Sequence, residues 1–282
     1  MSTTLPREEY VEQVYFFRAL GERMRQNIAA QDLLQALQEE LLSTTKLPMA
    51  IEFMSAELRL LGVFAEAMGR LKHYFAPFQT FVVAEAEDAQ SRFDFGVAMD
   101  ILAREAQYRA DGAPPQGLFL YQYETLCRNR LAYDRGLEAM SGDPAYDDRW
   151  RDFCLAVRKQ IGLVDIADLI FVHSEHYRTS HTSPGKAPPE VTQSILFGEK
   201  EGRIALANRR KEPLLLFSAL QRQLNYPFVP RPKPRDEAAP VLPALLRRVE
   251  RLEMRLKLLE EEGKGGIDLS QFMKPPNDGG ED

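Results

Sequence analysis

The chain has few cysteines and no long apolar run. Its 282 residues include only Cys127 and Cys154. Two cysteines form no disulfide framework and match no metal-site spacing, so we expect free thiols in a reducing compartment. The most apolar stretch, residues 162–172, is shorter than a membrane span and contains two aspartates. The N-terminal residues have no basic start and no apolar core, so we expect no signal peptide, no membrane contact and a cytoplasmic protein.

The sequence also lacks the common fingerprints of catalysis. It contains no Gly-x-x-x-x-Gly-Lys-Ser/Thr, no Gly-x-Gly-x-x-Gly, no Gly-x-Ser-x-Gly and no His-Glu-x-x-His. The Gly-Lys-Gly-Gly run at 263–266 lacks the strand–loop–helix setting that a phosphate-binding loop needs. We therefore expect a protein without enzymatic activity and without a cofactor.

What the sequence does contain is apolar residues at helical spacing. Near the N-terminus they recur every three or four positions, at Tyr10, Val14, Phe17, Gly21, Met24 and Ile28. This spacing places them on one face of a helix that begins at Pro6. Similar patterns predict an all-α, multi-helix body of about eight helices, with a short strand at 81–83 as an alternative. The other expected helices of the body cover 32–42, 48–77, 78–108 with a break near residue 91, 118–140, 147–160 and 163–177.

The expected helix at 48–77 carries two apolar faces. One face holds Ile51, Met54, Leu58, Leu61, Ala65 and Met68, and the other holds Phe53, Leu60, Phe64 and Leu71. A helix that is apolar on two sides is buried on both. We therefore expect this helix to be the central one of the body, with Leu58 and Leu61 fully buried.

The composition changes after residue 178. A polar, proline-containing stretch at 179–189 is typical of a linker, and the segment 199–224 predicts two short helices that meet at Pro213. Six prolines between residues 227 and 243 predict an extended, stiff connection. The expected segments are a helical body at 1–178, a linker at 179–198, a basic helical arm at 199–226, a proline-rich linker at 227–241, a short coiled coil at 242–262 and a disordered acidic tail at 263–282.

The strongest pattern in the sequence is a heptad repeat. Its apolar residues are spaced alternately three and four apart, at Leu242, Leu245, Val249, Leu252, Leu256 and Leu259. The flanking e and g positions carry glutamate and arginine, which is what pairing between chains needs. We expect weak self-association into dimers or trimers. Because the repeat covers only two heptads, a helix that folds back onto residues 1–177 is the alternative.

Three histidines lie close together at residues 173, 176 and 181. In a continuous helix, His173 and His176 would face the same side, where they could hold a divalent metal. A helical di-iron site needs Glu-x-x-His pairs on two helices, but position 173 is His, not Glu, and the chain contains no Glu-x-x-His pair. A polar helix end is the favoured interpretation. A metal-dependent helical-bundle enzyme that uses His173 and His176 is the first alternative function.

A basic segment stands between two acidic ones. Residues 198–235 hold nine Lys and Arg against three Asp and Glu. The candidates for contact with a partner are Arg203, Arg209, Arg210 and Lys211. The helix that follows is apolar, at 213–220, and therefore unsuited to reading bases. We expect this arm to dock on the acidic body or on a protein partner, with nucleic-acid binding through 200–235 as the second alternative.

The C-terminal tail contains one apolar island at 267–273. Within it, Leu269 and Phe272 are candidates for docking on a partner. The rest of the tail has too little apolar content to offset the entropy of ordering it. Taken together, these patterns predict a non-enzymatic interaction or scaffold protein that self-associates and binds a protein partner whose identity the sequence does not give.

Overall fold

The computed structural model describes residues 4–26, 30–88, 90–91, 93–181 and 194–231, apart from the side chain of Leu61. These residues form thirteen helices and no strand, which confirms the all-α prediction. The helices are α1 (Arg7–Met24), α2 (Ala30–Glu40), α3 (Leu47–Leu61), α4 (Phe64–Arg70), α5 (Pro77–Glu87), α6 (Phe95–Ala110), α7 (Pro115–Asn129), α8 (Tyr133–Ser141), α9 (Asp148–Gln160), α10 (Ile166–Val172), α11 (Glu175–His181), α12 (Glu199–Ala207) and α13 (Pro213–Leu224).

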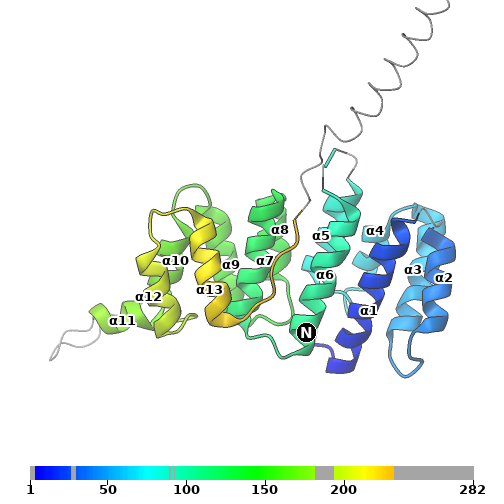
Figure 1. Ribbon diagram of the computed structural model, residues 1–282, viewed down its shortest axis with the longest axis horizontal. Helices are drawn as coiled ribbons and strands as arrows, with labels where there is room; N and C mark the ends of the chain where they lie inside the picture. The colour runs from blue at the N-terminus through cyan, green and yellow to red at the C-terminus, as the bar shows by residue number, and fades with distance from the viewer. Residues whose placement is uncertain (1–3, 27–29, 89, 92, 182–193, 232–282) are drawn as a thin grey trace, which may run out of the picture. The chain divides into compact units, whose positions relative to one another are not determined.

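Within the described residues, the helices lie side by side in a row (Figure 1). The row runs from α2 and α3, past α1, α4, α5 and α6, to α7 and α8, and ends with α9 to α13. Helix α1 packs mainly on α6, far from it in sequence, and α13 packs on α7. Helices α12 and α13 therefore belong to the same compact unit as the helices before them.

Several helix starts lie where local chemistry predicts them. Pro6 precedes α1, and Tyr10, Val14 and Phe17 are buried as the stripe predicted. The Asp147 side chain accepts the backbone N–H of Trp150 at 3.0 Å and so caps α9. A break between α5 and α6 and a division of the 199–224 segment before Pro213 are also confirmed. Residues 81–83 are helical, so the alternative of a strand there is wrong.

The predicted helix at 48–77 is wrong in its extent and in its position. Gly62 adopts a left-handed conformation, with φ of 75°, and ends α3 before α4 begins. Leu58 is buried, but Leu60 is 79% exposed, so the second apolar face is not covered along its length. Helix α3 packs on α1, α2 and α4 and lies near one end of the row (Figure 1). It is therefore not the central helix.

Two further predicted helices are each divided. The 118–140 helix ends as α7 at Arg130, which has a φ of 54°, and resumes as α8. The 163–177 helix breaks at Ser174, which pairs with Phe197 in an isolated β-bridge. In this bridge the Glu175 N–H donates to the carbonyl oxygen of Phe197 at 3.0 Å. The body therefore has more helices than the eight predicted.

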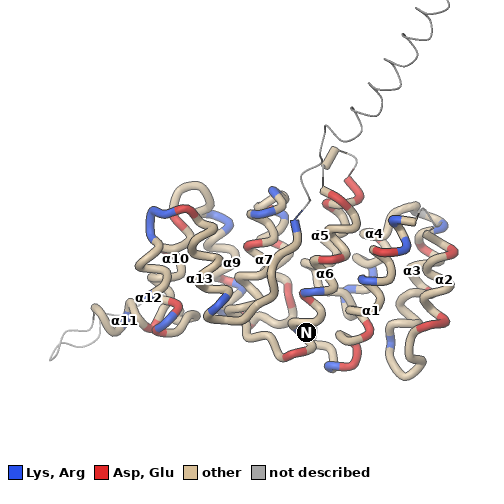
Figure 2. Tube along the Cα trace, viewed as in Figure 1, with Lys and Arg blue, Asp and Glu red and all other residues tan. Residues whose placement is uncertain are grey.

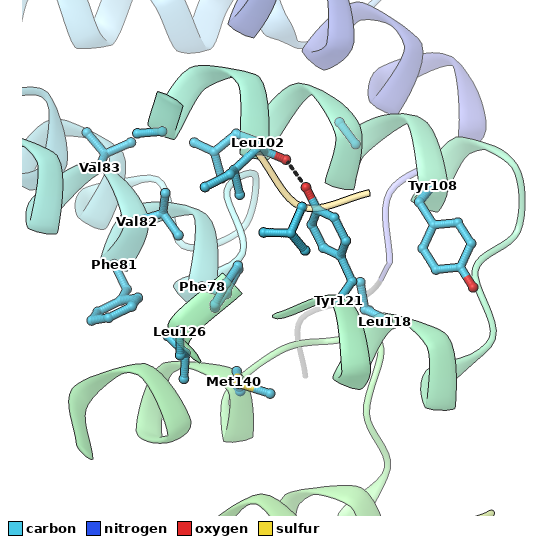
Figure 3. Packing of buried hydrophobic residues seen from close by; sticks show 14 of the residues in the cluster. Phe78, Phe81, Val82, Val83, Leu102, Tyr108, Leu118, Tyr121, Leu126 and Met140 are labelled. Atoms are coloured by element: carbon cyan, nitrogen blue, oxygen red, sulfur yellow. Dashed lines mark hydrogen bonds between the residues drawn. The ribbon is translucent and has the colours of Figure 1, made fainter. Parts of the chain in front are cut away.

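Apolar and aromatic side chains fill the interior along the row, including the space between α5, α6, α7 and α8. Figure 3 shows Phe78, Val82 and Leu126 among the side chains that gather between these helices. The Tyr121 hydroxyl donates to the carbonyl oxygen of Ile101 at 2.8 Å, so this buried ring carries no unpaired donor. None of the described helices combines the length and the apolar character that crossing a membrane requires.

Candidate functional site

The site is built on the antiparallel pair α1 and α6. At one end the Arg7 guanidinium donates to the carbonyl oxygen of Ala110 at 3.2 Å, and at the other Arg25 pairs with Asp100 at 3.1 Å. Between them Gly21 lies against Met99, where a Cβ on the glycine would approach the Met99 Cβ to 2.8 Å. The absence of a side chain at Gly21 therefore lets the two helices approach closely.

A groove of about 480 Å³ runs beside this helix pair. Its size is that of a ligand-binding pocket, which commonly measures about 300–1,000 Å³. Three parts of the chain contribute to it: α1, α6 and the residues that follow α13. The lining residues are Arg18, Glu22, Asp100, Ala103, Arg104, Gln107, Tyr108, Asp111, Asn225, Tyr226 and Pro227.

Two tyrosines fix the C-terminal wall of the groove. The Tyr108 hydroxyl donates to the carbonyl oxygen of Leu224 at 3.1 Å, and the Tyr226 hydroxyl donates to the Glu124 carboxylate at 2.7 Å. Burial raises the pKa of Tyr108 to about 12. Burial, together with the Glu124 charge, raises the pKa of Tyr226 further. Both hydroxyls therefore stay protonated at neutral pH and hold the wall as hydrogen-bond donors.

The polar side chains of the groove differ in how far the protein already satisfies them. The Asp100 carboxylate pairs with Arg25, and the Asp111 carboxylate accepts from the Gln107 amide at 3.1 and 3.2 Å. By contrast, Arg18 and Arg104 are exposed and make no ion pair or side-chain hydrogen bond within the described parts of the chain. The groove therefore presents two guanidinium groups that are available to a ligand.

Behind the groove, the inner face of α6 carries a buried charged network. The Arg109 guanidinium lies between the Glu105 and Asp143 carboxylates, with its Nη2 atom at 2.9 Å from Glu105 and in contact with Asp143. The Gln122 amide donates to the same two carboxylates at 2.7 and 3.1 Å and accepts from the Tyr146 hydroxyl at 2.8 Å. The side chains of Arg109, Glu105 and Asp143 are at most 4% exposed. We call these five residues the Arg109 network.

The charges of the Arg109 network determine how it titrates. Burial alone would raise the pKa of Asp143, but the Arg109 charge and the hydrogen bonds around the carboxylate outweigh it and hold the pKa below its usual value. Burial alone would lower the pKa of Arg109, but Asp143 and Glu105 outweigh it and raise that pKa. Asp143 and Arg109 are thus both charged at neutral pH. Because its three charged side chains are almost inaccessible to solvent, we assign it a structural role.

The histidine pair does not have the geometry that the sequence suggested. His173 ends α10 while His176 lies in α11, so the two do not share one helix face. The His173 Nδ1 atom lies 2.9 Å from the carbonyl oxygen of Leu169, and the His176 Nδ1 atom lies 2.8 Å from the Glu199 carboxylate. Among the residues that the structure describes, no three His, Cys, Asp or Glu side chains are grouped as metal ligands.

The basic candidates of the arm lie among carboxylates of the same chain. Arg203 pairs with Glu199 at 3.0 Å, and Arg209 pairs with Asp168. The Arg210 backbone N–H donates to the Asp165 carboxylate at 2.9 Å. In Figure 2, basic and acidic residues lie together near α12. These intramolecular contacts account for part of the basic charge, and a role of Arg203, Arg209, Arg210 and Lys211 in binding a partner stays a prediction.

Other candidates lie outside the described residues. They are the heptad positions Leu242, Leu245, Val249, Leu252, Leu256 and Leu259, together with Leu269 and Phe272 of the tail.

The sequence analysis did not predict the groove. A signal was present in α1, because the exposed residues Val11, Tyr15, Arg18 and Glu22 recur at helical spacing beside the buried stripe.

Comparison of this chain with protein-family models, with curated proteins and with solved structures finds no match.

Proposed function

We propose that this protein is a non-enzymatic interaction protein, in which the groove beside α1 and α6 receives a segment of a partner protein. The observation that carries the proposal is the groove itself: it has a partly apolar floor, at Ala103, Tyr108 and Pro227, and two guanidinium groups without a partner among the described residues. The groove is lined mainly by polar side chains around this apolar floor, and such a cleft can fix both the position and the orientation of a bound segment. The hydroxyls that could take part in proton transfer, on Tyr108 and Tyr226, are bonded to the protein itself.

The partner segment can be detected by photo-crosslinking. We would place p-benzoylphenylalanine at Glu22, which is exposed and lines the groove, and separately at Arg59, which is exposed on α3 outside it. In cells of the source organism, the groove position should give a discrete crosslinked protein band and the Arg59 position should not. Equal labelling from both positions, or none from Glu22, would contradict a partner in the groove.

The second part of the proposal is self-association through residues 242–262. The alternating spacing of Leu242, Leu245, Val249, Leu252, Leu256 and Leu259 supports it. A helix of this length is only marginally stable on its own, so we expect a weak equilibrium between single chains and dimers or trimers. This role would place two or more grooves in one assembly and so increase the avidity for a partner that has repeated binding segments.

Self-association is tested by light scattering over a range of protein concentrations. Leu252→Glu places a charge on the seam of the heptad repeat and should give single chains at every concentration. Met254→Glu adds the same charge two residues away, at the outward f position, and should leave the association unchanged. A wild-type protein that stays monomeric at high concentration, or an equal effect of the two variants, would overturn the coiled coil.

A further inference from the structure

Two guanidinium groups and one side-chain amide are among the hydrogen-bonding groups that remain available in the groove. Arg18 and Arg104 offer cationic donors that match carboxylates. Asn225, held in a left-handed conformation with φ of 51° at the end of α13, is exposed. Its side-chain amide makes no hydrogen bond to the parts of the chain that the structure describes. An amide offers both a donor and an acceptor, the same pair that a peptide group presents.

We propose that the groove binds an extended peptide segment whose carboxylate side chains pair with Arg18 and Arg104. This inference rests on the proposed function and gives the chemistry of the partner. In this arrangement the Asn225 amide bonds to the main chain of the segment. An apolar side chain of the segment lies against Ala103, Tyr108 and Pro227.

The length of the groove matches a short extended segment. The lining residues of α6 and its C-cap run from Asp100 to Asp111, which corresponds to about 17 Å along the helix axis. An extended chain covers that distance in about five residues.

The unpaired guanidinium groups of the groove favour carboxylates in the bound segment. Of the three carboxylates that line the groove, Asp100 is neutralised by Arg25 and Asp111 accepts from Gln107. Glu22 has no ion pair within the described residues, and it lies four residues after Arg18 on the same face of α1. Two guanidinium groups without an ion pair in the described residues thus face a ligand, together with the Glu22 and Asp111 carboxylates, which no cation of the described residues pairs with. A bidentate guanidinium–carboxylate pair is also stronger than a neutral hydrogen bond.

The inference is tested with the full-length protein and a peptide array. Each ten-residue peptide has one Phe and two Glu separated by one to five residues, and each is matched by versions with Gln or with Lys in place of Glu. We expect binding of the Glu peptides at one or two spacings. Fluorescence polarisation should then show an affinity about tenfold to a hundredfold lower for the Gln version, because a charge-assisted hydrogen bond is lost at each site.

Variants locate the binding in the groove. Arg18→Gln and Arg104→Gln should each weaken binding of the Glu peptide about tenfold or more. Asn225→Gly keeps the left-handed backbone accessible and should weaken the Glu and Gln peptides by the same factor. A control protein with both Arg59→Gln and Arg222→Gln loses two exposed arginines outside the groove and should bind as the wild type does.

Three results would overturn the inference: no binding of any Glu peptide, equal or tighter binding of the Lys versions, or full affinity in the Arg18 and Arg104 variants. The failure of this inference can be told from failure of the proposed function. A crosslinked partner from position 22 without a preference for carboxylates leaves the interaction role standing and removes its acidic chemistry. Leu252→Glu, which tests self-association alone, should not change the affinity for the soluble peptide.

Discussion

The inner and outer faces of helix α6 use the same side chain in opposite ways. Arg109 on the inner face is buried and holds two carboxylates. Arg104, five residues earlier on the same helix, is exposed in the groove and has no ion pair within the described residues. A buried charge is tolerated only when it is paired and hydrogen-bonded, whereas an exposed one stays available. Arg109 therefore stabilises the fold, whereas Arg104 can bind a ligand.

The sharpest test of this comparison replaces both arginines by methionine, one at a time. Arg109→Met leaves the Glu105 and Asp143 carboxylates buried without their cation. We expect the free energy of unfolding to fall by about 3–5 kcal/mol, measured by urea denaturation. Arg104→Met, the matched control on the same helix, should leave the unfolding midpoint almost unchanged. Similar losses in the two variants would show that the inner and outer faces do not differ in this way.

Acid titration tests the same network without removing its cation. The folded-state pKa of Asp143 lies below the ordinary value of 3.8, so its contribution to stability is complete above that pH. The contribution is lost as the pH falls from 3.8 through the folded-state pKa, where the carboxylate protonates. Wild-type stability should therefore fall more steeply below pH 3.8 than that of Asp143→Asn. Parallel curves in urea denaturation at pH 2 to 5 would argue against an ionised Asp143.

The features that the sequence could predict depend on neighbouring residues, and those that it could not predict depend on residues far apart in the chain. Helix starts depend on neighbouring residues, and Pro6 therefore predicted the start of α1. The breaks at Arg130 and Ser174 depend on tertiary structure, because a left-handed arginine and a bridge to Phe197 carry no local signal. The groove brings Arg18, α6 and Asn225 together from distant parts of the chain, so no short motif could indicate it.

A smaller loss of stability is expected at the contact between α6 and the end of α13, which Tyr108 makes with Leu224. Tyr108→Phe removes the hydrogen bond to the carbonyl oxygen of Leu224 and keeps the buried ring. The net contribution of such a bond is about 0.5–1.5 kcal/mol, so we expect a loss of this size in denaturant unfolding. Amide hydrogen exchange at Asn225 and Tyr226 should become faster if this bond holds the groove wall. Unchanged exchange would assign the position of the wall to Tyr226 alone.

The smallest effect is expected for the basic arm, where arginines are paired but exposed. Arg209 pairs with Asp168, and its guanidinium lies 5.7 Å from the centre of the Phe171 ring, with its side chain 41% exposed. Exposed ion pairs contribute about 0.2–1 kcal/mol, so Arg209→Gln should change the unfolding free energy by no more than about 1 kcal/mol.

The same variant distinguishes an arm packed on its own chain from a nucleic-acid interface. If Asp168 neutralises Arg209, then Arg209→Gln should not change the affinity for a generic DNA duplex or its dependence on salt, measured by fluorescence anisotropy. An arginine that contacts phosphate would instead lower the salt slope by about one on removal. A lower salt slope would show that the charge of Arg209 is available to a ligand, like that of Arg104, and is not used inside the protein, like that of Arg109. It would also make the nucleic-acid alternative the stronger account of residues 200–235.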